Sequence, residues 1–344
     1  MAVGGGAVSA AGTDARRVLV TGGSGFIGTN LVDWLLGRGY GVLSFSRRPP
    51  REPRHAAVFR QGDVLDAGQL IRAIDEFKPT DVVHLAAATL SHRGAGAPDY
   101  SANVAGTQSM IRALSEARGV RRCVFASSHV IAHPDGRPHE RDERDDPVAG
   151  YARSKAAAEQ VVQADTTMSC DWCMVRPIAV WGPWFDVPFR PFFEAVLRRR
   201  YFHLGRDESP KRLAYVGNVC HQLERLLAAP REAVHRQTFY LADEEPTTLR
   251  RWAELIASRA GVRPPRTLPE PLVRAAALAG DVVQSAGWRG TSLTTFRLRN
   301  MRTDTGGYDV GPVMRIAGAM PFVPAAAVDL TLAWLRDHGQ LDRR

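Results

Sequence analysis

The length, composition and charge of the chain indicate an ordinary globular protein. Its 344 residues, 44% of them hydrophobic, suffice for one large or two modest cores. No stretch reaches the roughly 18 uninterrupted apolar residues of a membrane span, and the first residues lack the pattern of a signal peptide. We therefore expect a disordered lead-in over residues 1–15, a cytoplasmic location and no membrane partner. The net charge of +9 comes from scattered arginines, so we expect small ligands rather than nucleic acid.

The four cysteines fit a reducing compartment. Cys170 and Cys173 form a single C-x-x-C pair, and no second pair completes a zinc site. We expect no metal and interpret these thiols as buried side chains near a strand.

Short apolar strands alternate with helical segments from residue 16 onward. Strands are predicted at residues 16–22, 41–47, 81–87 and 122–128, with helices at 28–39, 66–77 and 103–119. This rhythm is typical of βαβ units around a parallel sheet. After about residue 181 the pattern changes to Pro, Trp, Phe and Arg with longer connections, which predicts a second, smaller region.

The first strand runs into three glycines spaced three apart, in the segment VLVTGGSGFIG. A strand that passes through glycines into a helix brings a pyrophosphate to the helix N-terminus, where free N–H groups favour anions. A side chain at Gly22 or Gly25 would obstruct that approach, and Gly28 permits close packing of helix on strand. The segment predicts a dinucleotide site in a Rossmann-type, doubly wound α/β fold.

The end of the second strand bears on the choice of cofactor. A carboxylate usually binds the ribose hydroxyls of NAD at this place, whereas this chain has Ser46 followed by Arg47 and Arg48. A small hydroxyl and two guanidinium groups suit a 2′-phosphate. The sequence favours NADP(H), and NAD(H) is the alternative cofactor. Arg47 and Arg48 can also be a solvated strand end without a role in binding.

A tyrosine and a lysine four residues apart, Tyr151 and Lys155, share one face of a predicted helix. A free phenol titrates near pH ~10 and shuttles protons poorly at neutral pH. A neighbouring ammonium, together with the positive charge of an oxidised nicotinamide, is expected to lower the pKa of the phenol.

These motifs occur in the order found in the extended short-chain dehydrogenase/reductases, and residues 16–338 resemble that family. The resemblance implies that Ser128 orients the substrate, Tyr151 is the general acid/base and Lys155 binds the ribose. It implies a cofactor site made of Gly22, Gly25, Phe26, Ile27, Gly28, Ser46, Arg47, Arg48, Asp63, Val64, Leu85, Ala86, Ala87, Asn103, Tyr151, Lys155 and Pro177.

The family's architecture also implies a division of the chain. We expect an NAD(P)-binding Rossmann domain over residues 16–180 and a smaller α/β substrate lobe over 181–344, with a segment near 213–230 returning to the first domain. The helices around Asn103–Ala117 and Tyr151–Ala164 are those that pair across a two-fold axis in the family. We therefore expect a homodimer.

The substrate lobe is rich in rings and cations, which suit the base and diphosphate of a nucleotide sugar. The substrate residues predicted are Ser128, His129, Trp181, Trp184, Arg190, Lys211, Arg212 and Arg299. Dehydration is disfavoured, because His129 and Val130 stand where sugar dehydratases of this family carry acids. We expect hydride transfer on a nucleotide sugar, by a 4-ketoreductase or an epimerase.

Two other interpretations remain open. The segment AYVGNVCHQLERLL resembles the 3β-hydroxysteroid dehydrogenase branch, in which the aromatic lobe would hold an apolar ring system without a phosphate clamp. A non-catalytic dinucleotide-binding regulator would be expected to have lost Tyr151 or Lys155, and both are present. The aromatic cluster can equally be core packing.

Overall fold

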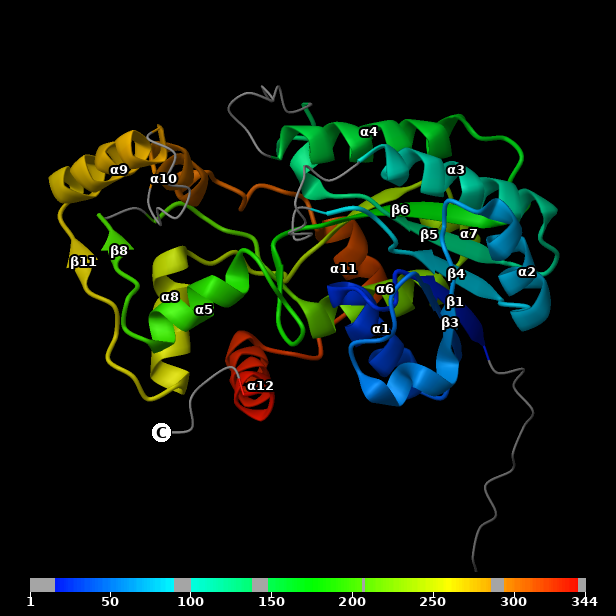
Figure 1. Ribbon diagram of the computed structural model, residues 1–344, viewed down its shortest axis with the longest axis horizontal. Coiled ribbons are helices and arrows are strands. Elements are labelled where there is room, and N and C mark those ends of the chain that lie inside the picture. Colours follow the sequence, from blue (N-terminus) through cyan, green and yellow to red (C-terminus); the bar gives the residue numbers. More distant parts are fainter. Residues whose placement is uncertain (1–15, 90–99, 138–147, 206–207, 286–293, 340–344) are drawn as a thin grey trace, which may run out of the picture.

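The computed structural model describes residues 16–89, 100–137, 148–205, 208–285 and 294–339. A parallel sheet of seven strands has the order β10-β6-β5-β4-β1-β2-β3 and occupies one half of the molecule in Figure 1. Its strands are β1 (Arg17–Thr21), β2 (Gly41–Ser46), β3 (Phe59–Gln61), β4 (Asp81–His84), β5 (Arg122–Ala126), β6 (Asp171–Pro177) and β10 (Thr238–Leu241).

Helices cover both faces of this sheet (Figure 1). One layer holds α2 (Ala67–Phe77), α3 (Ser101–Glu116) and α4 (Ala149–Ala164), and the other holds α1 (Phe26–Leu36) and α6 (Val216–Ala228). Side chains alternate between the layers: Val18 and Val20 of β1 pack in one core cluster and Leu19 in the other. Because both faces are buried, the strands are apolar almost throughout. The arrangement confirms the predicted doubly wound α/β fold.

The second region is built mainly from helices. This region also contains two small two-stranded sheets. One pairs β7 (Val180–Trp181) with β9 (Ala214–Tyr215), and the other pairs β8 (His203–Leu204) with β11 (Thr267–Leu268). Its helices are α5 (Phe189–Leu197), α8 (Leu249–Arg259), α9 (Glu270–Ser285), α10 (Thr295–Arg302), α11 (Gly311–Ala317) and α12 (Pro324–Asp337). Short helical turns occur at η1 (Pro53–Val58), η2 (His129–Ile131) and α7 (Arg231–Val234).

Helix α6 packs on the sheet half, although it follows the first strands of the lobe. Trp34 Nε1 of α1 donates to the Glu224 carboxylate of α6 at 2.7 Å, and the Tyr40 hydroxyl donates to the same carboxylate at 3.1 Å. The buried Arg122 of β5 donates to the carbonyls of Leu226 and Ala229 at the end of α6. These bonds fix the helix to the sheet.

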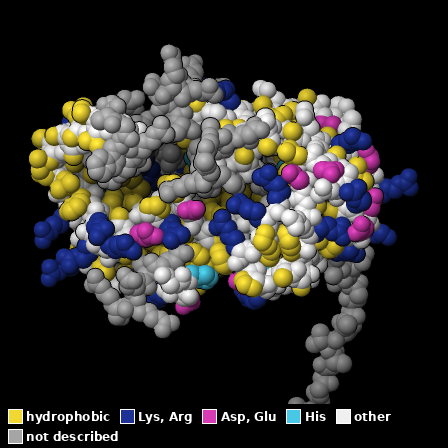
Figure 2. Space-filling view, in the orientation of Figure 1, with side chains coloured by type: hydrophobic (Ala, Val, Ile, Leu, Met, Phe, Trp, Pro, Cys, Tyr) yellow, Lys and Arg dark blue, Asp and Glu magenta, His cyan; other side chains and the backbone are white. Residues whose placement is uncertain are grey.

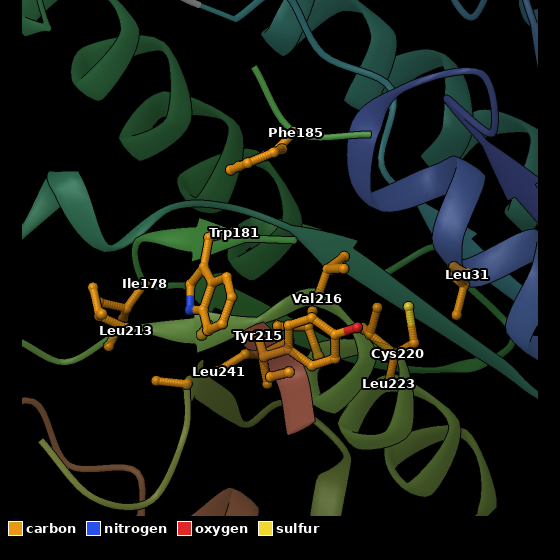
Figure 3. Packing of buried hydrophobic residues seen from close by; sticks show 14 of the residues in the cluster. Leu31, Ile178, Trp181, Phe185, Leu213, Tyr215, Val216, Cys220, Leu223 and Leu241 are labelled. Atoms are coloured by element: carbon orange, nitrogen blue, oxygen red, sulfur yellow. The ribbon is translucent and has the colours of Figure 1, made fainter. Parts of the chain in front are cut away.

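One core cluster runs without interruption from α1 and α6 into the lobe. At its centre the Trp181 side chain is 2% exposed and faces Tyr215 (Figure 3), with 5.2 Å between the two rings. The rings of Phe193 and Trp252 lie 5.7 and 5.4 Å from it. Trp181 is therefore a core residue, and its predicted role as a substrate contact is wrong.

None of the described helices is long and apolar enough to cross a membrane. The four cysteines are buried and unbridged. Within the described ranges, no group of three or more His, Cys, Asp or Glu residues is arranged to hold a metal ion.

Candidate active site

The glycine loop joins β1 to α1 at the carboxyl edge of the sheet. Gly22 has φ +71°, and a Cβ there would lie 2.8 Å from the Ala86 nitrogen. A Cβ on Gly28 would lie 2.2 Å from the Gly22 carbonyl oxygen, so this glycine allows helix α1 to pack on the loop, as expected. The role predicted for Gly22 needs correction, because its hydrogen faces the chain after β4.

Gly25 differs from the other two glycines, because a Cβ there would meet only the Gly22 carbonyl oxygen, at 3.0 Å. Gly25 is also the N-cap of α1, and no side chain caps this helix. The first N–H groups of a helix have no partner within it. An uncapped helix start behind a glycine is a cradle that fits a pyrophosphate.

The end of β2 is tied to this loop. Ser46 is buried, and its hydroxyl accepts a hydrogen bond from the Ser24 N–H at 3.2 Å. The Ser24 hydroxyl in turn donates to the Arg48 carbonyl at 2.8 Å. Arg47 is exposed, and its guanidinium lies 4.0 Å from the Asp63 carboxylate. The predicted cofactor residues of β2 and β3 thus lie together, with a guanidinium at the rim.

The other predicted cofactor residues lie at the same edge. Phe26 and Ile27 begin α1, both half-buried, and Val64 follows β3 beside Gly106. Half-buried residues after β4 complete the edge: Leu85, Ala86 and Ala87.

Asn103 of α3 acts mainly on the protein itself. Its side-chain oxygen accepts from the Ala88 N–H at 2.7 Å, and its amide donates to the Ala88 carbonyl at 3.1 Å and to the Ser154 hydroxyl at 2.9 Å. The side chain therefore ties the chain after β4 to helix α4. It positions the edge and the catalytic helix relative to each other.

Ser128 and Tyr151 come together at this edge. Ser128 follows β5 in an extended conformation, and its hydroxyl accepts from the Val130 N–H at 3.4 Å. Burial raises the pKa of Tyr151 to about 12, while a hydrogen bond with Ser128 opposes the rise and Tyr100 adds to it. The phenol is therefore protonated at neutral pH in the protein alone.

Lys155 lies one turn further along α4 and is buried. Its ammonium donates to the Ala126 carbonyl at 2.7 Å. Burial lowers the pKa of Lys155 to about 8, which the Glu159 carboxylate opposes. The expected lowering of the Tyr151 pKa by Lys155 is not found in the protein itself, because burial dominates the phenol.

Three neighbours of the pair are not among the predicted site residues. The Tyr100 ring lies 5.8 Å from that of Tyr151. His84, buried at the end of β4, has its pKa lowered to about 3 by burial and by Lys155, so it is neutral. Glu159 pairs with Arg176 at 2.7 Å. Only the Glu159 spacing, one turn after Lys155, gives a signal in the sequence.

Three of the other predicted substrate residues contact the protein itself. The His129 ring is fixed by its Nδ1, 3.0 Å from the Pro177 carbonyl. Trp184 packs on Trp334 and His338 at the C-terminal helix. Arg190 pairs with Glu194 at 3.0 Å within α5.

The two cations expected to clamp a diphosphate are bound to the backbone. Lys211 is buried, and its ammonium donates to the Thr303 carbonyl. The Arg212 guanidinium donates to the Gly306 carbonyl at 3.0 Å and to the Asp243 carbonyl at 3.2 Å. Both side chains bind carbonyls of the lobe, and their role toward a substrate stays a prediction. Arg299 lies in α10, and its side chain is outside the described part of the structure.

Comparisons with known proteins assign the chain to a family. The profile of the NAD dependent epimerase/dehydratase family matches residues 18–242. Over 283 residues the chain is 33% identical to a 3β-hydroxysteroid dehydrogenase/Δ5→4-isomerase of Mycobacterium tuberculosis, which covers 76% of this chain and 74% of that protein.

Two further relatives differ in their substrates. The chain is 30% identical over 275 residues to a 4-hydroxy-2-methyl-3-oxo-4-farnesyl-3,4-dihydroquinoline-1-oxide ketoreductase of Stigmatella aurantiaca, covering 77% of this chain and 80% of that one. It is 35% identical over 180 residues to a UDP-glucose 4-epimerase of Mycolicibacterium smegmatis, covering 48% and 57%.

Solved structures share the fold. The UDP-glucose 4-epimerase of Thermotoga maritima superposes with a TM-score of 0.67 at 20% identity, over 94% of this chain and 99% of that one. The matched residues 18–242 include all seven strands of the sheet except the first residue of β1. The chain is an enzyme that belongs to the NAD-dependent epimerase/dehydratase family, the extended short-chain dehydrogenase/reductases.

Proposed function

We propose that this enzyme interconverts a secondary alcohol and a ketone on an apolar substrate, with NADP(H) as its cofactor. The observation that carries the chemistry is that Ser128 lies beside Tyr151 at the carboxyl edge of the sheet, with Lys155 one turn further along the helix. An acid and an orienting hydroxyl directed at one point are what reduction of a carbonyl requires.

The protein residues have separate tasks in the reducing direction. The Tyr151 phenol, protonated because its pKa is raised to about 12, donates its proton to the carbonyl oxygen. The Ser128 hydroxyl donates a hydrogen bond to the same oxygen and orients it. A nicotinamide, when bound, supplies the hydride. The buried ammonium of Lys155, one turn further along the helix and held by the Ala126 carbonyl, would bind the ribose of the cofactor.

The apolar substrate is favoured over the nucleotide sugar that the sequence motifs favoured. Lys211 and Arg212 donate to backbone carbonyls, so a diphosphate would have to displace bonds already made. Relatives aligned over more than two thirds of both chains include a 3β-hydroxysteroid dehydrogenase and a ketoreductase of a farnesylated quinoline. Both names describe large apolar substrates.

The cofactor preference rests on the end of β2. Ser46 is small and faces the glycine loop, and Arg47 is exposed beside it. A 2′-phosphate at this rim would gain a guanidinium partner and would meet no carboxylate at Ser46. NADP(H) should therefore bind more tightly than NAD(H).

A second candidate is reduction or epimerisation of a nucleotide sugar. It is supported by the 35% identity to a UDP-glucose 4-epimerase over 180 residues. This function uses the same Ser128, Tyr151 and Lys155, so it differs from the first only in what the lobe recognises.

For the assembly we propose a homodimer through α3 and α4, which pack together on one face of the sheet. Analytical ultracentrifugation should give the mass of two chains at micromolar concentration. A single-chain mass would remove this part of the proposal.

Substrate assays distinguish the two candidates. Oxidation of NADPH is followed with a 3-ketosteroid, a long-chain 3-oxoalkanoate ester and a UDP-4-ketosugar, and UDP-glucose is assayed for epimerisation by chromatography. We expect kcat/KM at least tenfold higher for an apolar ketone, and turnover lower by roughly two to four orders of magnitude with the Tyr151→Phe control. Turnover confined to the UDP-sugars would favour the second candidate.

A further inference from the structure

Helix α9 has an unusual surface at the far end of the substrate lobe. The exposed fractions of Leu272, Leu278 and Val282 are 60%, 60% and 68%, values high for large apolar side chains. Val283, on the same helix, is 38% exposed. These four belong to the nine large apolar residues that are exposed in the described structure. Figure 2 shows hydrophobic side chains gathered at this end of the molecule.

The exposed residues form one continuous face. At 100° per residue, the exposed positions of α9 that are apolar fall within an arc of about 160° that holds no polar side chain. These positions are Pro271, Leu272, Ala275, Ala276, Leu278, Ala279, Val282 and Val283.

The opposite side of α9 is already used for packing. Val273 and Ala277 are fully buried and form a small core cluster with Leu298 of α10. Among the described residues, the outer face of α9 therefore has no packing role. A helix that is apolar on both sides is typical of a buried helix, so its outer face is one that another surface is expected to cover.

The charge around this face selects the partner. Arg274 and Arg302, on α9 and α10, are neutralised by the Glu270 carboxylate. Arg263 and Arg266, just before α9, are exposed, and Figure 2 shows Lys and Arg side chains along the same edge of the lobe. A second copy of this chain would bring two basic rims together, whereas an anionic headgroup layer complements the rim.

We propose that α9 is an interfacial helix whose apolar face inserts into an anionic lipid surface, with the arginines beside it on the headgroups. This is peripheral binding and needs no spanning helix. It revises the expectation that the protein has no membrane partner, and it stands whichever substrate the enzyme uses. The α9 end also lies far from α3 and α4 (Figure 1), so membrane binding leaves the proposed dimer face open.

Vesicle co-sedimentation of the full chain tests the proposal. Vesicles of phosphatidylglycerol and phosphatidylcholine should retain the protein, while pure phosphatidylcholine should retain at least tenfold less. Raising the salt concentration should release the protein in part, because it screens the arginines.

Variants separate the two contributions. Leu278→Glu with Val282→Glu should reduce binding at least tenfold, and Arg263→Gln with Arg266→Gln should reduce it only on anionic vesicles. Leu330→Glu on α12, at a residue 45% exposed, is the matched control and should bind like the parent. Unchanged thermal melting shows that each variant is folded.

Three results would overturn the proposal. The parent chain could fail to sediment with either vesicle, or the α9 double variant could sediment as well as the parent. The third is a self-association of the parent, seen in ultracentrifugation without lipid, that only the α9 variant abolishes. That result would assign the face to a second copy instead.

Discussion

The sheet half and the substrate lobe use similar residue types for different purposes. At the carboxyl edge of the sheet, the glycine loop, Ser128 and Tyr151 form the candidate active site. The strands and helices on which they pack hold them in place. In the lobe, Trp181 and Arg212 contact the protein itself, through aromatic rings and backbone carbonyls. The difference shows that an aromatic ring or a cationic side chain indicates a ligand only where other residues of the chain do not already pack on it or bind it.

The largest expected effect is on catalysis at the sheet edge. Tyr151→Phe removes the proton donor but keeps the ring, so turnover should fall by roughly two to four orders of magnitude, the usual range for a positioned acid/base. Cofactor affinity, measured by fluorescence titration, should stay near that of the parent. Tyr100→Phe, which keeps the neighbouring ring, is the control and should retain most activity. Near-normal turnover of Tyr151→Phe would remove the mechanism.

The second effect concerns the core of the lobe. Trp181→Ala should lower the free energy of unfolding by about 3–5 kcal/mol, because a buried indole leaves a cavity. Trp184→Ala removes a half-buried ring that packs against Trp334 of the C-terminal helix, and it should lower the free energy of unfolding by less. Urea unfolding measures both. A Trp181→Ala variant as stable as the parent would show that the ring is not part of the core.

A third effect is a pH dependence of stability that comes from the sheet half. The pKa of His84 is lowered to about 3 in the folded protein, so below pH ~6.5 the unfolded chain binds a proton that the folded chain excludes. Stability should be fully present above about pH 6.5 and fall by about 1.4 kcal/mol per pH unit toward pH 3.

The matched variant isolates the histidine. His84→Gln retains a polar partner for Thr21, whose hydroxyl lies 2.9 Å from His84 Nδ1. Between pH 6.5 and 5 its free energy of unfolding should fall less steeply with decreasing pH than that of the parent, because about one proton fewer is bound on unfolding. Equal slopes would mean that His84 titrates in the folded state as it does in the unfolded chain.

The smallest effect is on cofactor preference. Ser46→Asp should reverse the preference for NADPH over NADH by about tenfold or more, near 1.4 kcal/mol, because a carboxylate repels the 2′-phosphate and accepts the ribose hydroxyls. The preference of the parent should shrink as salt screens Arg47. Titration of both nucleotides against both proteins measures the ratio. If the ratio stays unchanged, the arginines are a solvated strand end.

The sequence predicted the sheet half well, because local rules determine it. The alternation of strands and helices, the glycine spacing and the Tyr151–Lys155 spacing each express short-range geometry. Their outcome depends little on contacts between distant residues. The sheet order and the meeting of Ser128 with Tyr151 follow once parallel strands place their carboxyl ends at one edge.

The lobe could not be predicted in the same way. Whether Trp181 lies inside or faces a ligand depends on α8, some 70 residues later, which supplies Trp252. The partners of Arg212 are carbonyls of residues 31 and 94 positions away. Tyr100 reaches Tyr151 through the packing of α3 on α4, which no local pattern encodes.

The most direct test is hydride transfer itself. A secondary alcohol deuterated at the carbinol carbon is incubated with oxidised NADP, and the mass of the nucleotide is measured. We expect deuterium in the reduced nucleotide with the parent, and an equal amount per folded protein with Trp181→Phe. With Tyr151→Phe we expect almost no label. Equal labelling by Tyr151→Phe and the parent, or loss of labelling only in a folded Trp181→Phe, would contradict the assignment of chemistry to the sheet edge and of packing to the lobe.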